Sequence, residues 1–193
     1  MKLDGIIHIG AHYGEEIPTY IDCGVKHLVM FEPLEDNFNT LAEKIKDFDA
    51  NIIMHKTALG SEAKKETMYV SSNDMESSSI LKPKEHLNNH PDISFPTTED
   101  VDVNRLDDYD CKGYNFIAMD VQGYELEVLK GARKTLENIE YVYCEVNRDE
   151  VYENNAYVEE IDEFLSAYNM ERMETTWGGG IWGDALYIRK NLI

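Results

Sequence analysis

The feature that most constrains the fold is a short apolar run followed by two glycines, within residues 6–16. Residues 6–9 are apolar apart from His8, a pattern typical of a buried strand. Gly10 and Gly14 come next, and a glycine lets the backbone turn and approach a ligand with no Cβ in the way. Two glutamates then open a helix. Strand, glycine turn and helix N-terminus together predict a cradle for a cofactor.

A carboxylate suited to a nucleoside cofactor follows at Glu32, at the end of a second apolar run. It comes about twenty residues after the glycine turn, the separation at which an acidic side chain can accept hydrogen bonds from both ribose hydroxyls. The glycine turn alone is a weak indicator. The full order of strand, turn, helix, strand and acid predicts nucleoside binding.

Charge and length exclude several classes of protein. The 193-residue chain has a formal net charge of −20, from 38 acidic and 18 basic residues. No cluster of Lys and Arg stands out, so we expect no binding to nucleic acid or to an anionic membrane surface. We interpret the acidity as a solubility feature or as adaptation to a salty environment. The length fits one domain over residues 1–193.

Cysteine use and hydropathy predict a cytoplasmic protein. The three cysteines have no metal-ligand spacing, and an odd number in mostly apolar surroundings indicates reduced thiols. Residues 1–5 do not begin a signal peptide, because Asp4 and His8 interrupt the apolar residues. No apolar stretch approaches the roughly eighteen residues that a membrane span needs.

Alternating strands and helices predict an α/β fold with a mainly parallel sheet. Buried strands are expected at residues 6–9, 27–31, 51–56, 115–120 and 141–146, with helices at 15–23, at 34–48, after residue 124 and at 158–168. Two final strands, at 170–177 and 185–189, have no helix between them and should form an antiparallel hairpin. The prediction is a seven-stranded sheet with helices on both faces. The hairpin favours a methyltransferase-like sheet over a dinucleotide-binding one.

The region between the third and fourth buried strands is irregular. Residues 67–72 predict a short strand, and Val101, Val103 and Leu106 predict an edge strand. Residues 73–100 carry three serines in a row, three prolines and little periodicity, which is too long for a silent connection. We predict that this segment is a lid or insertion over the site, with disorder as the alternative.

Four motifs, spread over nearly the whole chain, carry a family resemblance. They are IGAHYG at 9–14, FEP at 31–33, FIAMDVQGYELEVLKGA at 116–132 and DALYIR at 184–189. In this order they resemble the FkbM-type methyltransferases, class I enzymes that use S-adenosylmethionine (SAM). The resemblance implies a Rossmann-like class I methyltransferase fold and an O-methyltransferase acting on a sugar or polyketide hydroxyl. The chain departs from the family at His8, where Asp is usual, and at Gln122, where Glu is usual. The family's N-terminal extension is absent.

The glycine turn, the acid after the second strand and the end of the third strand supply the candidate SAM-binding residues. Glu32 is expected at the ribose, residues 57–59 near the adenine, and His12 within reach of the methionine part. The same residues also fit ordinary roles at strand ends, and His8 fits a satisfied histidine under the turn. The full candidate set is His8, Gly10, Ala11, His12, Tyr13, Gly14, Glu32, Pro33, Thr57, Ala58, Leu59 and Asp120.

Asp120 and Glu145 are the candidate catalytic residues. Each is expected at the C-terminal end of one of two neighbouring strands, the edge where ligands bind in open α/β sheets. Methyl transfer needs donor and acceptor held about 3 Å apart and aligned, and a hydroxyl acceptor must also lose a proton. Asp120 is expected to act as base, substrate anchor or metal ligand. No metal ligand is assigned; Mg²⁺ is an alternative that Gln122 disfavours.

Two tryptophans are candidates for the acceptor site. Trp177 and Trp182 flank a glycine run, and an indole face stacks well on a sugar ring. The expected partner is a small-molecule or glycan acceptor. Core packing is the alternative for at least one of the two.

Other functions stay open at this point. A nicotinamide-dependent oxidoreductase is disfavoured, because residues 10–14 lack the three-glycine dinucleotide pattern. A non-catalytic SAM-binding or scaffold domain of the same fold is an alternative, given the changes at His8 and Gln122. The chain could also be one domain of a larger glycan-modifying protein.

Overall fold

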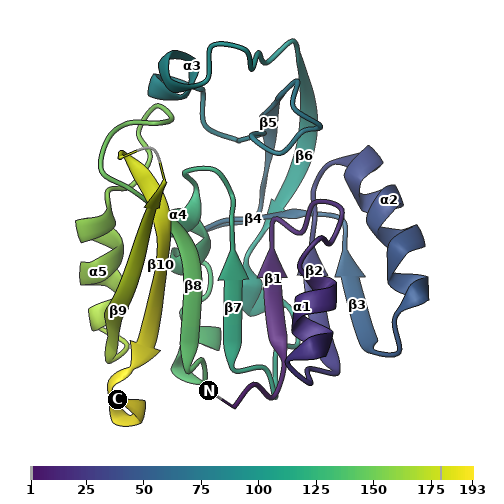
Figure 1. Cartoon of the computed structure of the whole chain (residues 1–193), viewed down its shortest axis with the longest axis vertical. Helices are drawn as coiled ribbons and strands as arrows, with labels where there is room; N and C mark the ends of the chain where they lie inside the picture. The colour runs from purple at the N-terminus through teal and green to yellow at the C-terminus, as the bar shows by residue number, and fades with distance from the viewer. Residues whose placement is uncertain (1, 179) are drawn as a thin grey trace.

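The centre of the computed structural model, which describes residues 2–178 and 180–193, is a seven-stranded sheet in the order β3-β2-β1-β7-β8-β10-β9 (Figure 1). Its strands are β1 (Ile6–Ile9), β2 (His27–Phe31), β3 (Asn51–His55), β7 (Phe116–Met119), β8 (Tyr141–Asn147), β9 (Met170–Gly178) and β10 (Trp182–Arg189). The first five run parallel, whereas β10 is antiparallel to both of its neighbours. The predicted mostly parallel sheet with a C-terminal antiparallel hairpin is confirmed.

The strand order reverses at β1, which pairs with β2 on one side and with β7 on the other. The chain therefore builds outward to β3 and returns to β7 on the opposite side of β1. In open α/β sheets a ligand binds in the crevice at the carboxyl ends of strands where the order reverses. Gly10 directly follows β1 and Asp120 directly follows β7, so both lie at this crevice.

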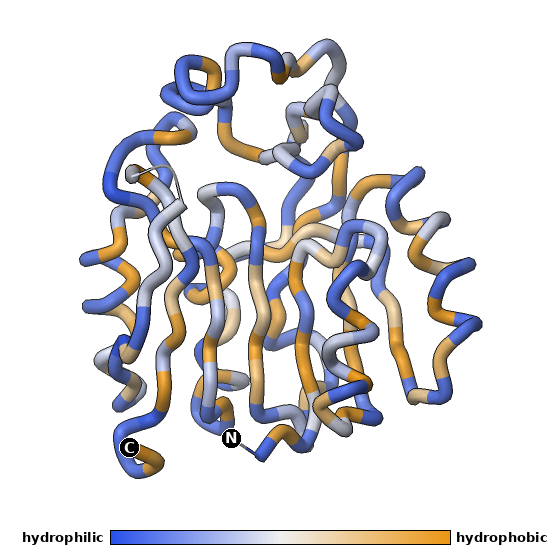
Figure 2. Tube along the Cα trace, in the orientation of Figure 1, coloured by the Kyte–Doolittle hydropathy of each residue, from blue (hydrophilic) through white to orange (hydrophobic). Residues whose placement is uncertain are grey.

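Helices cover both faces of the sheet, as predicted. On one face α1 (Ile17–Asp22) and α2 (Glu35–Lys44) pack on side chains that include Ile6 of β1. On the other face α4 (Glu125–Lys130) and α5 (Val158–Ser166) pack on side chains that include Ile7. Successive strand residues point to opposite faces, so the central strand β1 is buried on both sides, whereas the edge strand β3 is partly exposed. The strands β1 and β2 accordingly appear mostly apolar in Figure 2, whereas the edge strand β9 appears mostly hydrophilic.

A second, three-stranded sheet lies above the carboxyl ends of the main sheet, in the order β4-β6-β5. Its strands are β4 (Ala58–Leu59), β5 (Lys64–Val70) and β6 (Thr97–Asn104). Two expectations are corrected here. Residues 97–100 belong to β6 rather than to a lid, and Leu106 lies in a 3₁₀ turn beyond the strand. The alternation that buries Val101 and Val103 extends further back along the chain because β5 supplies an antiparallel partner.

The segment between β5 and β6, residues 71–96, is called the lid below. It contains one short helix, α3 (Glu85–Asn89), and crosses over the carboxyl ends of the central strands (Figure 1). Backbone hydrogen bonds join it to the loop after β8: the N–H groups of Lys84 and His86 donate to the carbonyl of Val151, and that of Glu153 donates to the carbonyl of Lys82. This segment is therefore ordered by packing, and the alternative of disorder is wrong.

Several element ends differ from the prediction. The first helix begins at Ile17, two residues after its expected start, because Gly10 to Gly14 form a turn before it. The second helix ends at Lys44 and continues as a 3₁₀ turn, and the two C-terminal strands are longer than expected. Within the described residues, no helix has the length and apolar character needed to cross a membrane.

Candidate active site

Two adjoining cavities lie at the carboxyl edge of the main sheet. A narrow cavity of about 60 Å³ lies over the ends of β2 and β4, and a large cavity of about 480 Å³ lies over β7 and β8. Gly10, His12, Glu76, Asp120 and Gln122 line both. The shared lining makes the two cavities parts of one cleft, with the glycine turn between them.

The glycine turn is held against the neighbouring strands. The N–H groups of Gly10 and Ala11 both donate to the carbonyl of Phe31, each at 3.0 Å. Gly10 has a φ of +79°, and a Cβ there would lie 1.9 Å from the carbonyl oxygen of Asp120. Only glycine fits this position, because the loops after β1 and β7 approach one another at the backbone.

Glu32 lies buried at the narrow cavity, where its carboxylate is fixed by two backbone donors. The N–H of His12 donates to Oε2 and the N–H of Leu34 donates to Oε1, each at 2.9 Å. Burial raises the pKa of Glu32, and these two donors oppose that shift. Each carboxylate oxygen has a further lone pair, so both can still accept a hydrogen bond from a ligand hydroxyl.

Asn37 of α2 adds an acceptor that sequence reasoning did not find. Its side chain is buried and lines the narrow cavity, and its Oδ1 has no hydrogen-bond partner. A buried polar atom left unpaired costs about 1–3 kcal/mol, which a ligand donor would relieve. Together with Glu32 it gives the cavity acceptors suited to a ribose, so the residues present fit a nucleoside cofactor.

The remaining walls of the narrow cavity are mostly apolar. Pro33, Ala58 and Leu59 line it as predicted, and lid residues Met75 and Ile80 close it from above. Thr57 also lines it. Its hydroxyl donates to the carbonyl of Asp102 at 2.8 Å and accepts from Asn104, so this side chain holds β4 against β6. A flat apolar slot beside an acid suits a purine ring.

Three candidate cofactor residues do not line either cavity. Ala11 is fully buried in the core beneath α1 and α2. A Cβ on Gly14 would meet Leu41 and Ile17, so this glycine allows the turn to pack closely on the helices. Tyr13 stacks on His12 with ring centroids 3.9 Å apart. These residues shape the turn, and their role at the cofactor stays a prediction.

Asp120 and Glu145 are brought together at the large cavity by Gln122. The Gln122 amide donates through Nε2 to Asp120 Oδ1 at 2.6 Å and to Glu145 Oε2 at 3.3 Å. The hydroxyl of Tyr152 donates to Gln122 Oε1 at 2.6 Å, which fixes the direction of the amide. Gln122 has a φ of +54°, a strained conformation of the kind found at functional sites.

The carboxyl groups of this cluster bind protons more tightly than free side chains do. Asp120 is exposed to the cavity, yet desolvation by the surrounding protein raises the pKa of its carboxyl group. The hydrogen bond from Gln122 opposes this shift. Burial raises the pKa of Glu145 well above its usual range, and the neighbouring charges of Asp120 and Glu125 add to the shift. A carboxylate with a raised pKa is a stronger base than a free side chain, which favours proton transfer from an acceptor hydroxyl.

His8 of β1 and His12 of the glycine turn make different contacts. His8 is buried and neutral at neutral pH, because burial lowers its pKa to about 4; its Nδ1 lies 3.3 Å from the Tyr20 hydroxyl. His12 joins the turn to the lid, with Nε2 2.7 Å from the carbonyl oxygen of Asp74 and Nδ1 3.1 Å from Glu15. His8 is thus satisfied under the turn, as its alternative reading held, while also lining the large cavity.

The two tryptophans occupy different places. Trp182 lines the large cavity. Trp177 packs against the main core, with the Arg148 guanidinium 3.5 Å from its ring centroid. Of the two tryptophans, Trp182 therefore lies where the acceptor is expected, and Trp177 packs against the core, as the alternative predicted.

Gln122 and Tyr152 are the residues that sequence reasoning missed in the large cavity cluster. Gln122 was visible only as a departure from the family pattern. Tyr152 gave no signal, because its hydroxyl bonds Gln122 and the carbonyl of Ser77 from a distant part of the chain. Within residues 2–178 and 180–193, no group of three or more His, Cys, Asp or Glu side chains is placed to hold a metal ion.

The pattern of the chain matches a known family. The model of the methyltransferase FkbM domain matches residues 8–171, from the first strand to the start of β9. The chain belongs to this family.

Relatives of the FkbM-domain chain agree with this assignment. The 2-O-methyltransferase NoeI of Sinorhizobium fredii is 31% identical over 114 residues, which cover 57% of this chain and 46% of that protein. The crystal structure of methyltransferase FkbM from Methylobacillus flagellatus KT matches with a TM-score of 0.64 and 20% identity, covering 96% of this chain and 43% of that one. The present chain therefore spans less than half the length of either relative.

A more distant structure shares the fold. Magnesium protoporphyrin IX methyltransferase from Synechocystis PCC 6803, with bound SAM, matches with a TM-score of 0.54 and 7% identity, covering 95% of this chain and 69% of that one. At such identity the likeness concerns the fold of the FkbM domain alone.

Proposed function

We propose that this FkbM-domain chain is a SAM-dependent O-methyltransferase that methylates a hydroxyl of a carbohydrate or related small molecule. The observation that carries the proposal is the joined pair of cavities, with a ribose-type acceptor set in one and paired carboxylates in the other. The printed activity of NoeI, a 2-O-methyltransferase, supports oxygen as the methylated atom. The acidic surface agrees with a small-molecule or glycan acceptor, a cytoplasmic location and no nucleic-acid partner.

The cofactor half of the proposal rests on the narrow cavity. Glu32 and Asn37 would accept the ribose hydroxyls, while the wall at Ala58 and Leu59 would face the adenine. SAM supplies a methyl group that is already activated by its positive sulfur. The protein must then hold donor and acceptor in line, which binding in a joined cleft achieves.

The chemical half rests on Asp120. Its carboxylate is exposed to the large cavity and next to the glycine turn, so an acceptor hydroxyl bound there would donate its proton to a carboxylate oxygen. Gln122 holds that carboxylate in place through its 2.6 Å bond. Glu145 shares the same amide donor, and burial together with the charge of Asp120 raises the pKa of Glu145.

Two measurements test the proposal. Calorimetric titration with SAM and, separately, with NAD decides between a methyltransferase and an oxidoreductase; SAM binding alone is expected. Transfer of labelled methyl from SAM to a panel of sugars and small alcohols then tests turnover. Binding of NAD without SAM would establish the oxidoreductase alternative, and SAM binding without transfer to any member would establish the non-catalytic one.

A further inference from the structure

We infer that the acceptor carries no negative charge: the large cavity takes a neutral or amino-substituted hydroxyl compound and rejects phosphorylated and uronic-acid sugars. This inference rests on the proposed function and specifies the substrate class of the same site. Five carboxylate residues line the large cavity: Glu15, Glu16, Glu76, Asp120 and Glu145. Among the described residues, no lysine or arginine lines it.

Two of the four histidines that line the cavity, His8 and His86, do not replace the missing cations. Burial lowers the pKa of His8 and of His86 to about 4 each, with His90 adding to the shift at His86, so both rings are neutral at neutral pH. His12 has acceptors at both ring nitrogens, Glu15 and the carbonyl of Asp74. Neither of its nitrogens is left to bind an anion.

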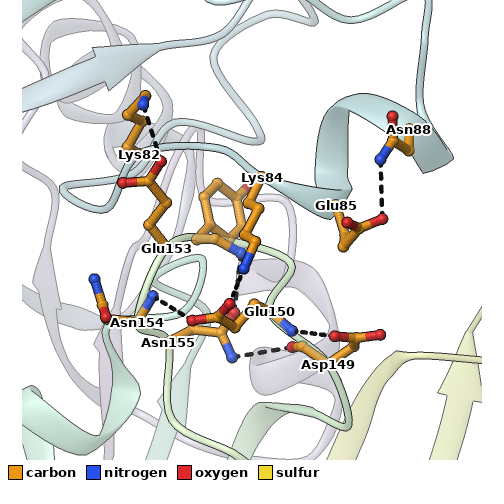
Figure 3. A network of polar contacts seen from close by, with 10 residues as sticks. Lys82, Lys84, Glu85, Asn88, Asp149, Glu150, Glu153, Asn154 and Asn155 are labelled. Atoms are coloured by element: carbon orange, nitrogen blue, oxygen red, sulfur yellow. Dashed lines mark hydrogen bonds and ion pairs between the residues drawn. The ribbon is translucent and has the colours of Figure 1, made fainter.

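Two lysines of the lid lie near the cleft but are already paired. Lys82 Nζ contacts Glu153 at 2.9 Å, and Lys84 forms an ion pair with Glu150 (Figure 3). Both partners belong to the loop after β8, so these ion pairs join the lid to that loop. A phosphate entering the cavity would have to break them to gain a cation.

Several polar atoms of the cavity lining are acceptors, which favour a ligand that donates hydrogen bonds over an anionic ligand. Asn73 lines the large cavity, and its Oδ1 is buried without a partner. Glu76 and Asp120 present further acceptors. Sugar hydroxyls and an ammonium group donate hydrogen bonds, whereas a phosphate or carboxylate offers only acceptors and repels like charge strongly in a partly desolvated site. The indole of Trp182 supplies a face for the sugar ring.

The test compares matched sugars that differ in charge, using the full chain saturated with SAM. Methyl glucoside, glucosamine, glucose 6-phosphate and glucuronate are assayed for methyl transfer, each as kcat/KM. The first two are expected to exceed the last two by at least tenfold. Equal or faster transfer to the phosphorylated or uronic sugar would overturn the inference and leave the methyltransferase function intact. No transfer to any member, with SAM bound, would overturn the carbohydrate function and this inference with it.

A pair of charge-reversal variants tests whether the cavity lining produces the selectivity against anionic sugars. Glu76→Lys introduces a cation into the lining, and Glu62→Lys changes the net charge equally at an exposed position that lines neither cavity. We expect Glu76→Lys to narrow the ratio between neutral and phosphorylated sugars at least threefold, and Glu62→Lys to leave it unchanged. An equal change in both variants would assign the selectivity to the overall charge of the protein and overturn the role of the cavity.

Discussion

The narrow and the large cavity differ in what builds them. The narrow one is walled by Gly10 and Glu32, which directly follow β1 and β2, and by Ala58 of β4, and their places follow from strand pairing. The large one is closed by the lid and the loop after β8, held together by contacts such as that of the Tyr152 hydroxyl with Ser77. The floor of the cofactor side is thus set by strand ends, whereas the acceptor side depends more on contacts between distant segments. The lid contributes to both cavities, with Met75 and Ile80 in the narrow one.

The two buried glutamates show the same difference. Glu32 accepts hydrogen bonds from two backbone N–H groups, whereas Glu145 has only the amides of Asn147 and Gln122, at 3.2 and 3.3 Å. Other carboxylates also lie near Glu145 and raise its pKa. Glu32 is therefore held ready to bind, while Glu145 lies in an environment that disfavours its charge.

The largest expected effect is on the acceptor side, at Asp120. Asp120→Asn keeps the size of the side chain and removes its capacity to take a proton, so kcat should fall by about 10²-fold or more, the range of general-base catalysis. SAM affinity should change little, because the ribose acceptors lie in the other cavity. Steady-state kinetics and calorimetry measure the two effects.

Asp22→Asn, at an exposed position of α1, is the matched control and should behave as the wild type. Full activity of Asp120→Asn would exclude Asp120 as the base. Loss of SAM binding with little loss of turnover at saturation would make it a cofactor ligand. Chelator sensitivity restored by Mg²⁺ would indicate a metal-assisted reaction instead.

The reciprocal effect is expected on the cofactor side, at Glu32. Glu32→Ala removes charge-assisted hydrogen bonds worth about 1.5–3 kcal/mol, so the Kd for SAM should rise at least tenfold. Glu32→Gln keeps the volume of the side chain, so it separates the loss of SAM affinity from a loss of structure. Glu35→Ala, an exposed acid three residues along paired with Lys56, is the control. An unchanged Kd in both Glu32 variants would remove Glu32 from the ribose site.

A several-fold effect is expected in limited proteolysis of the lid. Ser77, Ser78 and Ser79 at its base are buried, and Ser79 Oγ donates to the carbonyl of Gln122 at 2.7 Å. Residues 87–92 are mostly exposed. Cleavage should therefore begin within 87–96, and SAM with acceptor should slow it several-fold, because bound ligands hold the lid in place. First cleavage elsewhere, with this segment resistant, would contradict a lid role.

The difference between the cavities also explains which features the sequence could predict. The mostly parallel sheet, its antiparallel C-terminal hairpin and the position of Glu32 at a strand end follow from apolar runs, a glycine turn and strand ends, all of which are local patterns. The extension of β6 to Thr97 was missed, because it depends on pairing with β5 across the whole lid. Gln122 at the centre of the carboxylate cluster was seen only as an exception, because its partners Glu145 and Tyr152 are joined to it by the fold.

The directions of the side chains at the glycine turn could not be predicted from the sequence either. Ala11 and Tyr13 stand beside Gly10 in the sequence, yet the turn directs Ala11 into the core and Tyr13 onto His12. A positive φ at both Gly10 and His12 sets these directions. Such conformations depend on the approach of the β7 loop, which no local pattern encodes.

The smallest expected effect is on stability, at Glu145. Burial and neighbouring acids raise its folded-state pKa well above its usual range, so the folded protein binds this proton more tightly than the unfolded chain does. The ionised form therefore costs stability once the pH exceeds the unfolded pKa of about 4.3, and the cost grows until the pH reaches the folded value. Glu145→Gln removes the ionisation, so it should raise stability at pH 8, by on the order of 1 kcal/mol, and change it little near pH 4.5.

Thermal unfolding of wild type and Glu145→Gln across this pH range measures the effect. Glu137→Gln, at an exposed acid on the 3₁₀ turn before β8, is the control and should show no such trend. Lower stability of Glu145→Gln at pH 8 would mean that the carboxylate is held by favourable contacts, as Glu32 is, and would remove the difference drawn between the two glutamates. The activity of the same variant completes the comparison: a kcat close to wild type would leave Asp120 as the base and Glu145 as a charge beside it, whereas a loss equal to that of Asp120→Asn would make the two carboxylates one catalytic unit.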